Sequence, residues 1–249
     1  MTSGSQSYVV LGGTSCVAKA LAERIRAAGG NLLLTTRDAS SAAELAEQFS
    51  CETAVASADN SASIDGAVQW ALERFGRIDG VVNCIGSVLL KPAHLTTDQE
   101  WHDTLSTNLT SSFFLIRAAV KAMRQGGGSI VLISSAAAQI GLANHEAIAA
   151  AKAGIMGLTL SAAATYAGRG IRVNSVAPGL VKSEMTRKLW DTESAAAASK
   201  QMHALGRLGE PDDIAKAIAW LLDSENNWIT GQTISVDGGL SAVVPRTRV

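Results

Sequence analysis

The sequence predicts an α/β fold of the Rossmann-like, doubly wound type, with a parallel sheet of about seven strands and helices on both faces. Three observations predict it. Short apolar runs alternate with longer amphipathic stretches along the chain. Most of the short runs are apolar nearly throughout, as strands covered on both faces should be. No Pro/Gly/Ser-rich linker divides the 249 residues, so we expect a single domain over residues 1–249.

The expected elements follow in order along the chain. Strands are expected at Tyr8–Leu11, Asn31–Thr35, Gly80–Asn83, Ser129–Ser134, Arg172–Val176 and Gln232–Val236. Apolar residues at helical spacing predict helices at Lys19–Ala28, Ser41–Gln48, Ile64–Phe75, Gln99–Met123, Glu146–Ala167 and Asp212–Asp223.

Composition narrows the function classes. Hydrophobic residues make up 47% of the chain and charged residues 17%, which suits a large core and argues against disorder. The formal net charge is −1, and no long Lys/Arg cluster could follow a phosphate backbone, so we expect no nucleic-acid partner. A small-molecule substrate is the better expectation.

Cysteine usage and the N-terminus indicate a cytoplasmic protein. Cys16, Cys51 and Cys84 are odd in number and widely spaced, which fits neither a disulfide framework nor a zinc site, so no metal is expected. The polar stretch Met1–Ser7 does not resemble a signal peptide. No apolar run approaches the roughly 18 residues of a spanning helix, so no membrane contact is expected.

A glycine-containing loop joins the first strand to the first helix. A dinucleotide fold binds its pyrophosphate there, on backbone N–H groups at a helix N-terminus. Cys16 and Ala18 stand where a full fingerprint has further glycines, so the loop alone also fits a plain strand-to-helix turn. The expected cofactor contacts in the loop are Gly12, Thr14, Ser15 and Val17.

Several short motifs follow one another in order along the chain. They are Asn83-Cys84-Ile85-Gly86, Asn108 in Asn-Leu-Thr, Ser134-Ser135, Lys152-Ala153-Gly154, Arg172 to Gly179, Arg207 to Pro211, and Ile229 to Gln232 ahead of Asp237-Gly238-Gly239. These motifs resemble those of the short-chain dehydrogenase/reductase family over essentially the whole chain. Several matches in the right order make the resemblance specific. It implies the fold above and further cofactor contacts at Asn83 and Gly86.

The resemblance implies NADP as cofactor, with NAD as the alternative. Members that prefer NAD carry an acidic residue at the end of the second strand, whereas NADP users place an arginine beside the 2′-phosphate. Here Thr36 occupies the acidic position and Arg37 follows it, and a guanidinium suits a phosphate dianion. In the alternative, Arg37 is a solvated charge and Asp38 binds the ribose. Ser57 stands near the family's adenine-contacting aspartate, so adenine binding is expected to differ.

A second loop resembles the one that binds the nicotinamide carboxamide. It implies contacts from Pro178, Gly179, Val181 and the Ser183 hydroxyl. Pro178-Gly179 is also consistent with an ordinary turn.

The family's catalytic residues are Asn, Ser, Tyr and Lys, and the resemblance assigns three of them to Asn108, Ser135 and Lys152. Ile148 stands at the tyrosine position, four residues before Lys152 and thirteen after Ser135. In the family, the lysine binds the nicotinamide ribose and lowers the tyrosine pKa, while the serine holds the substrate carbonyl. An isoleucine cannot donate a proton.

Three alternatives stay open for the proton. His145 lies seven residues before Lys152, at the tyrosine position of the enoyl-acyl carrier protein reductase branch of the family, and histidine titrates near neutrality. A histidine there is also typical of a surface or helix-cap residue. A water relay through Asn108 and Lys152 is the second alternative, and an absence of redox chemistry is the third.

The segment 184–205 lies where the family has a lid over the substrate. Met185, Leu189, Trp190 and Met202 suggest either an apolar pocket wall or a surface that packs the lid on the body. The resemblance also implies a homotetramer or homodimer, formed through the expected helices 99–123 and 146–167 and the C-terminal strand.

Two function classes follow. The first is a cytoplasmic NADP(H)-dependent reductase that acts on a carbonyl or an activated alkene. The second is a dinucleotide-binding pseudoenzyme that serves as a regulatory or partner subunit. Retention of Ser135 favours the first class, and the departures in the glycine loop favour the second. We prefer the enzyme.

Overall fold

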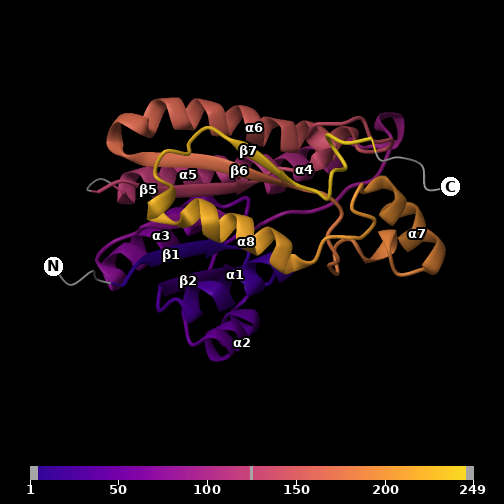
Figure 1. The fold of residues 1–249 in the computed structure, drawn as a ribbon. Helices are drawn as coiled ribbons and strands as arrows, with labels where there is room; N and C mark the ends of the chain where they lie inside the picture. Colours follow the sequence, from indigo (N-terminus) through magenta and orange to yellow (C-terminus); the bar gives the residue numbers. More distant parts are fainter. Residues whose placement is uncertain (1–4, 124–125, 245–249) are drawn as a thin grey trace.

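The computed structural model describes residues 5–123 and 126–244. Its strands form one parallel sheet in the order β3-β2-β1-β4-β5-β6-β7, with helices around it (Figure 1). The strands are β1 Ser7–Leu11, β2 Asn31–Thr36, β3 Glu52–Val55, β4 Gly80–Asn83, β5 Gly128–Ile133, β6 Ile171–Pro178 and β7 Thr233–Val236. The helices are α1 Cys16–Ala27, α2 Ala39–Phe49, α3 Ser61–Phe75, α4 Asp98–Leu105, α5 Ser111–Ala122, α6 Glu146–Tyr166, α7 Glu193–Met202 and α8 Pro211–Leu222. The predicted Rossmann-like fold is confirmed.

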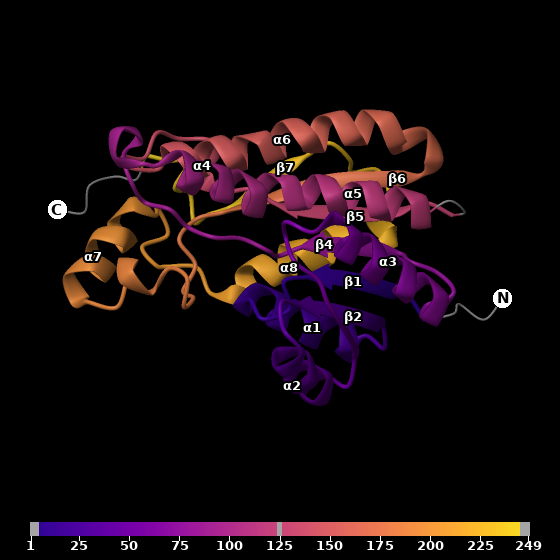
Figure 2. The same ribbon diagram turned by 180° about the vertical axis from the view of Figure 1, so that it is seen from behind.

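The sheet lies between two helical layers. Helices α1 and α8 pack together on one face, in front of the sheet in Figure 1, and α3, α5 and α6 lie on the other face, in front in Figure 2. Alternate side chains of β1 enter different cores: Val9 and Leu11 join the core under α3 and α5, whereas Tyr8 and Val10 join the core under α1 and α8. Both faces are buried, which explains why these strands are apolar nearly throughout.

The helix predicted over Gln99–Met123 is wrong in detail, because it consists of three pieces. Helix α4 ends at Leu105, a π-helical turn covers Ser106–Thr110, and α5 begins at Ser111. Hydroxyl side chains bond back to the helix here: Thr104 Oγ1 donates to the Glu100 carbonyl at 2.7 Å, and Ser111 Oγ to the Thr107 carbonyl at 2.7 Å. Such bonds compete with the regular helical pattern. The wide turn falls at Asn108, and π-turns are frequent at functional sites.

Two elements were not expected from the sequence. Strand β3 has four residues at the edge of the sheet, and its Val55 is 52% exposed, so it lacks an apolar run. Helix α7 is capped by Thr192, whose side chain accepts a hydrogen bond from Ala195 N, and it contains no buried residue. Without a buried stripe, helical periodicity gives no signal.

Among the described residues, one helix is long and apolar enough to cross a membrane, contrary to the sequence-based expectation. It covers Glu146–Arg169, with a mean hydropathy of 1.5 over the most apolar window. The stretch is α6 with the short 3-10 turn that follows, and α6 packs against β6 within the fold. Buried Lys152 lies in its first half. A core helix satisfies the same criteria of length and composition.

Candidate functional site

The predicted site residues gather at the carboxyl ends of the strands. Strand β1 lies between β2 and β4, so the strand order reverses at β1. In open α/β sheets, ligands bind in the crevice beside the strand ends at such a reversal. The loops after β1, β2, β4, β5 and β6 carry most of the predicted residues, and they meet at this edge.

The loop after β1 has the geometry of a phosphate-binding turn. Gly12 has a φ of 76°, and a Cβ added there would lie 2.8 Å from Ile85 N, so only glycine fits. Ser15 caps α1 by accepting a hydrogen bond from Ala18 N at 3.1 Å. The amides of Cys16 and Val17 lie at the open end of the helix, where phosphate oxygens bind. Cys16 and Ala18, which stand where a full fingerprint has glycines, are the first and third residues of α1.

Thr14 is exposed at the tip of this turn, and Val17 is half-buried in the first turn of α1. Both predicted contacts therefore lie on the phosphate-binding loop or its helix.

Arg37 and Asp38, which follow β2, differ in whether their charged groups are already engaged. Both Asp38 carboxylate oxygens accept hydrogen bonds from Ser41, one from its amide at 2.8 Å and one from its hydroxyl at 3.0 Å. These bonds cap α2 and lower the pKa of Asp38. Arg37 is exposed and forms no ion pair within residues 5–123 and 126–244. Buried Thr36 donates a hydrogen bond to the Asp38 carbonyl at 2.6 Å.

Asn83 holds the end of β4 against α5. Its amide nitrogen donates to the Ser111 and Ser112 hydroxyls at 2.9 and 2.8 Å, and its oxygen accepts from Ile85 N at 3.0 Å. The side chain is buried and fully engaged. Asn83 therefore shapes the loop that contains Gly86, and its side chain is not free for a ligand.

Gly86, Asn108 and Lys152 converge on one point. A Cβ added at Gly86 would lie 3.3 Å from Asn108 Oδ1 and 3.9 Å from Lys152 Nζ. Asn108 is buried in the π-helical turn, where its amide nitrogen donates to Ser87 Oγ at 2.9 Å and to the Thr104 carbonyl at 3.0 Å. Its oxygen accepts from Ser87 N at 3.1 Å.

Lys152 is a buried amine at the end of β5. It is 7% exposed, and its ammonium donates to the Ile133 carbonyl at 2.9 Å. Ser134 Oγ in turn donates to the Lys152 carbonyl at 2.8 Å, which fixes α6 to the end of β5. Burial disfavours the charged form and lowers the pKa of Lys152 to about 8. The amine can therefore exchange a proton near neutral pH.

The other two predicted catalytic residues, Ser135 and His145, precede Lys152 in the chain. Ser135 is half-buried, and its hydroxyl accepts from Ala137 N at 3.2 Å, which leaves its proton available to a substrate oxygen. Ile148 lies one turn before Lys152 on α6 and is 5% exposed. His145 precedes the first residue of α6, and its Nδ1 lies 2.7 Å from the Ala143 carbonyl. That contact places a proton on Nδ1.

The loop after β6 contains the predicted nicotinamide contacts. Pro178 ends β6, Gly179 follows it, and Val181 forms a bridge with Gly209. The Ser183 hydroxyl lies 3.0 Å from Thr186 Oγ1 and accepts from Thr186 N at 3.2 Å, so it is engaged with the start of the lid.

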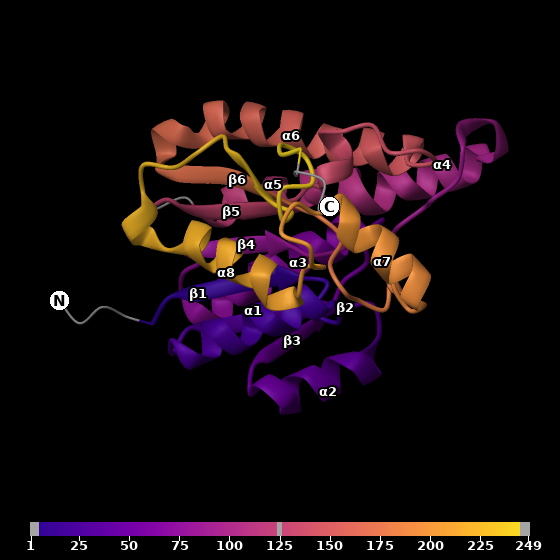
Figure 3. The same cartoon turned by 45° about the vertical axis from the view of Figure 1, so that its right-hand side comes forward.

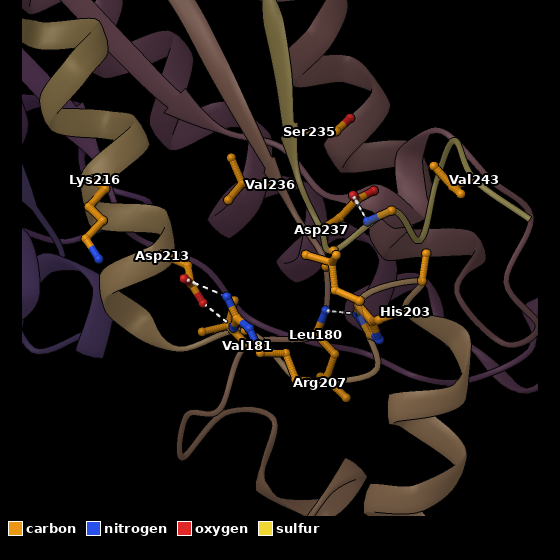
Figure 4. A pocket seen from close by; sticks show the side chains of 16 residues that line it. Leu180, Val181, His203, Arg207, Asp213, Lys216, Ser235, Val236, Asp237 and Val243 are labelled. Atoms are coloured by element: carbon orange, nitrogen blue, oxygen red, sulfur yellow. Dashed lines mark hydrogen bonds and ion pairs between the residues drawn. The ribbon is translucent and has the colours of Figure 1, made fainter. Parts of the chain in front are cut away.

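Sequence reasoning missed His203, which is 4% exposed and contacts this loop. Its Nε2 accepts a hydrogen bond from Leu180 N at 3.1 Å (Figure 4). Nothing in the local sequence singles it out, because it lies just after a helix that has no buried stripe.

The lid segment contains a short 3-10 turn, Arg187–Leu189, and α7, which stands beyond one end of the sheet (Figure 3). Met185 and Met202 are 48% and 46% exposed, so they do not pack the lid on the body. Leu189 and Trp190 are half-buried. A pocket of about 480 Å³ lies between the loop after β6, the start of α8 and the loop after β7 (Figure 4). It is lined by His203, Arg207 and Asp237 among others.

Comparisons with known proteins agree with the fold. Residues 12–241 match the family described as enoyl-(acyl carrier protein) reductase. The chain is 34% identical over 242 residues to the D-threitol dehydrogenase of Mycolicibacterium smegmatis, which covers 93% of this chain and 91% of the relative. It is also 34% identical over 238 residues to the 3-oxoacyl-(acyl-carrier-protein) reductase of Escherichia coli, covering 94% and 97% of the two chains.

Solved structures are similar over the same extent. A short-chain type dehydrogenase/reductase from Mycobacterium ulcerans superimposes with a TM-score of 0.93 at 26% identity, covering 98% of this chain and 93% of the other. The structure of ElxO with NADP bound gives a TM-score of 0.88 at 27% identity, covering 95% and 98%.

Fold, site and relatives together define an oxidoreductase built on a doubly wound parallel sheet. The chain belongs to the short-chain dehydrogenase/reductase family.

Proposed function

We propose that the protein is an NADP(H)-dependent reductase that acts on a carbonyl or an activated alkene. The observation that carries the proposal is the convergence of Gly86, Asn108 and buried Lys152 at the carboxyl edge of the sheet. A small residue, a polar anchor and a titratable amine at one point suit a bound nicotinamide ribose next to a reacting carbonyl. The 3-oxoacyl-(acyl-carrier-protein) reductase among the relatives is named for a reaction of this class.

The residues present fit NADP. The turn at Gly12 and the open end of α1 suit the pyrophosphate, and Arg37 suits the 2′-phosphate because it is exposed without an ion pair in the described part of the chain. Asp38 is a poor ribose ligand because Ser41 occupies its carboxylate. When bound, NADPH would supply the hydride. NAD is the alternative cofactor.

Lys152 and Ser135 have distinct roles in this proposal. The Lys152 ammonium binds ribose hydroxyls and, with a pKa lowered to about 8, passes a proton toward the substrate. The Ser135 hydroxyl donates to the substrate oxygen as negative charge develops on it. The lid, residues 184–205, covers the substrate, with Met185 and Met202 as its free apolar surface.

The proton must come from a non-standard donor. Ile148 occupies the tyrosine position, and the two tyrosines of the chain lie elsewhere. Tyr8 is near the amino end of β1, where its hydroxyl donates to Gln6 Oε1 at 2.8 Å. Tyr166 follows Lys152 by fourteen residues of α6, about 21 Å along a helix that rises about 1.5 Å per residue.

Water that exchanges protons with Lys152 is the donor we favour. His145 is the second candidate, but its Nδ1 faces the Ala143 carbonyl, so it would have to act as an imidazolium through Nε2. A His145→Ala variant with unchanged turnover would remove the histidine from the mechanism.

One observation favours a second function, that of a coenzyme-binding partner subunit without turnover: the side chain at position 148 is apolar and 5% exposed. Fluorescence titration with NADPH, followed by assays on ketones and enones, separates the two functions. Saturable binding with turnover supports the reductase. Binding with no turnover of any substrate, even with Ile148→Tyr, supports the partner subunit. No saturable binding contradicts both.

We further propose a cytoplasmic homotetramer or homodimer. Large apolar side chains are exposed on the proposed contact elements: Phe113 on α5 is 48% exposed, Leu160 on α6 is 62% exposed, and Trp228 before β7 is 96% exposed. Such residues are typical of interfaces when they form a patch. Light scattering of the purified protein tests this assembly, and Leu160→Glu is expected to shift it toward smaller species.

A further inference from the structure

His203 connects three segments at the carboxyl edge of the sheet. It follows the last residue of α7, and its Nδ1 lies 2.7 Å from the Ser199 carbonyl in that helix. Its Nε2 accepts from Leu180 N at 3.1 Å, in the loop after β6. Its Cβ lies 3.5 Å from a Cβ added at Gly238, in the loop after β7. Figure 4 shows the ring turned toward Leu180, with Asp237 beside it.

The two partners fix the protonation of the ring. A backbone N–H can only donate and a carbonyl can only accept, so Nε2 carries the lone pair and Nδ1 carries the proton. The imidazole is therefore neutral in this arrangement. Both ring nitrogens are occupied, so His203 is not a free acid for a substrate.

The segment next to the ring is closely packed. We use "nicotinamide loop" for residues Pro178–Val181. A Cβ added at Gly179 would lie 2.8 Å from His203 Nε2 and 2.9 Å from Asp237 Cα. The Leu180 carbonyl is also held, because it accepts from Gly209 N at 2.9 Å. The His203 hydrogen bond thus fixes the amide of a residue whose carbonyl is already held.

Several charged groups surround His203. Asp237, from the loop after β7, accepts hydrogen bonds from Gly239 N at 2.9 Å and from Ser241 N at 2.8 Å. Although burial opposes its ionisation, the hydrogen bonds from Ser241 and Gly239 keep the pKa of Asp237 below its ordinary value. The other charges that line the pocket are paired, Arg207 with Asp213 at 2.6 Å and Lys216 with Asp212 at 2.9 Å.

We propose that His203 is a positioning residue, which in its neutral form fixes the nicotinamide loop and ties it to the lid helix α7. The role rests on the proposed function, because it requires that Pro178–Val181 bind the nicotinamide. It adds a coupling between the lid and the cofactor site.

The hydrogen bond requires an acceptor at position 203. A side chain that cannot accept from Leu180 N leaves that amide without its partner, so the nicotinamide loop is less firmly held. We therefore expect such a substitution to weaken the binding of NADPH.

Fluorescence titration with NADPH at one fixed pH tests the role in four proteins. They are the wild type, His203→Gln, His203→Leu and the control His94→Gln, whose native side chain is exposed. In His203→Gln, the side-chain oxygen of the introduced glutamine can accept from Leu180 N, whereas the side chain introduced in His203→Leu cannot. The difference in NADPH affinity between these two variants is the readout.

One hydrogen bond is worth about threefold to tenfold in affinity. His203→Leu is expected to bind NADPH more weakly than the wild type by this factor, whereas His203→Gln and His94→Gln are expected to bind as the wild type does. Thermal unfolding of each variant identifies any that is not folded, and if His203→Leu is not, His203→Ala takes its place in the comparison.

NADPH binding by a folded His203→Leu variant as tight as that of the wild type would overturn the positioning role and leave the proposed function intact. Absence of NADPH binding by the wild type would overturn the proposed function and this role with it.

Discussion

Ile148→Tyr is the substitution that examines the site most directly. Ile148 lies one helical turn before Lys152 and is 5% exposed. A tyrosine hydroxyl at this position would lie near a buried ammonium, and an adjacent positive charge lowers the pKa of a phenol. The variant would then contain a proton donor that the native chain lacks at this place.

The magnitude follows from the competing contributions. A positioned general acid contributes about 10²- to 10⁴-fold to a rate. Three effects reduce the gain: the native protein already has a proton source in water, Lys152 is held by the Ile133 carbonyl, and a larger side chain enters a packed position. Overpacking costs about 1–3 kcal/mol of stability. We expect reduction of simple ketones to rise at least about tenfold, a barrier change of about 1.4 kcal/mol.

The matched control is Ile148→Phe, which adds the same ring without the hydroxyl. Both variants are assayed for kcat and KM with NADPH and a panel of ketones, and their thermal unfolding is compared. The rate is expected to rise only in the tyrosine variant. NADPH affinity should stay within about threefold of the native value, because the substitution should disturb cofactor binding by less than the loss of one hydrogen bond. Equal rates in folded tyrosine and phenylalanine variants would refute the reasoning.

Three further outcomes are expected. Arg37→Ala should weaken NADPH binding about tenfold and leave NADH binding unchanged in fluorescence titrations, because a charge-assisted contact to the 2′-phosphate is lost; equal effects on both cofactors would contradict this role. The pKa of Lys152 is about 8 in the native state and 10.5 when unfolded, so between these values the unfolded state carries the extra proton and the free energy of unfolding should rise with pH. Urea unfolding at about pH 8 and 9.5 should show a gain of about 2 kcal/mol for the wild type relative to Lys152→Met, and parallel curves would argue against the shift. Val173→Ala in β6, at a fully buried site, should lower the free energy of unfolding in urea by about 2 kcal/mol. Val55→Ala in β3, at a site that is 52% exposed, should lower it by less than about 1 kcal/mol. Similar losses in the two variants would contradict the burial of β6.

The sheet was predictable because strands that are buried on both faces are apolar nearly throughout. Strand β4 was predicted at its observed bounds, Gly80–Asn83, since all four of its residues are buried. Strand β3 was missed for the opposite reason, because an edge strand with Val55 exposed needs no apolar run. The break in the helix predicted over Gln99–Met123 arises from hydroxyl groups that bond to nearby carbonyls, which apolar periodicity does not detect.

Most of the candidate site could be located from the sequence, because the loops that carry it follow the strands of a recognisable fold. Gly86, Asn108 and Lys152 meet as the motif spacing indicates. What the side chains bind could not be predicted. Asn83 forms hydrogen bonds with Ser111 and Ser112, and Ser183 forms one with Thr186. These bonds depend on the folded arrangement of the side chains. His203 escaped notice because Leu180, whose amide it binds, lies in a loop 23 residues earlier in the chain.

Helix α7 has no buried residue, whereas α6 buries eight. The free energy needed to open a segment depends on the contacts that it loses, so α7 should detach from the body at a small fraction of the global unfolding free energy. Backbone amides of α7 should accordingly exchange their hydrogens with solvent much sooner than those of α6. Local opening of this one peripheral helix would leave the sheet and the loops that follow β1 and β4 in their native arrangement.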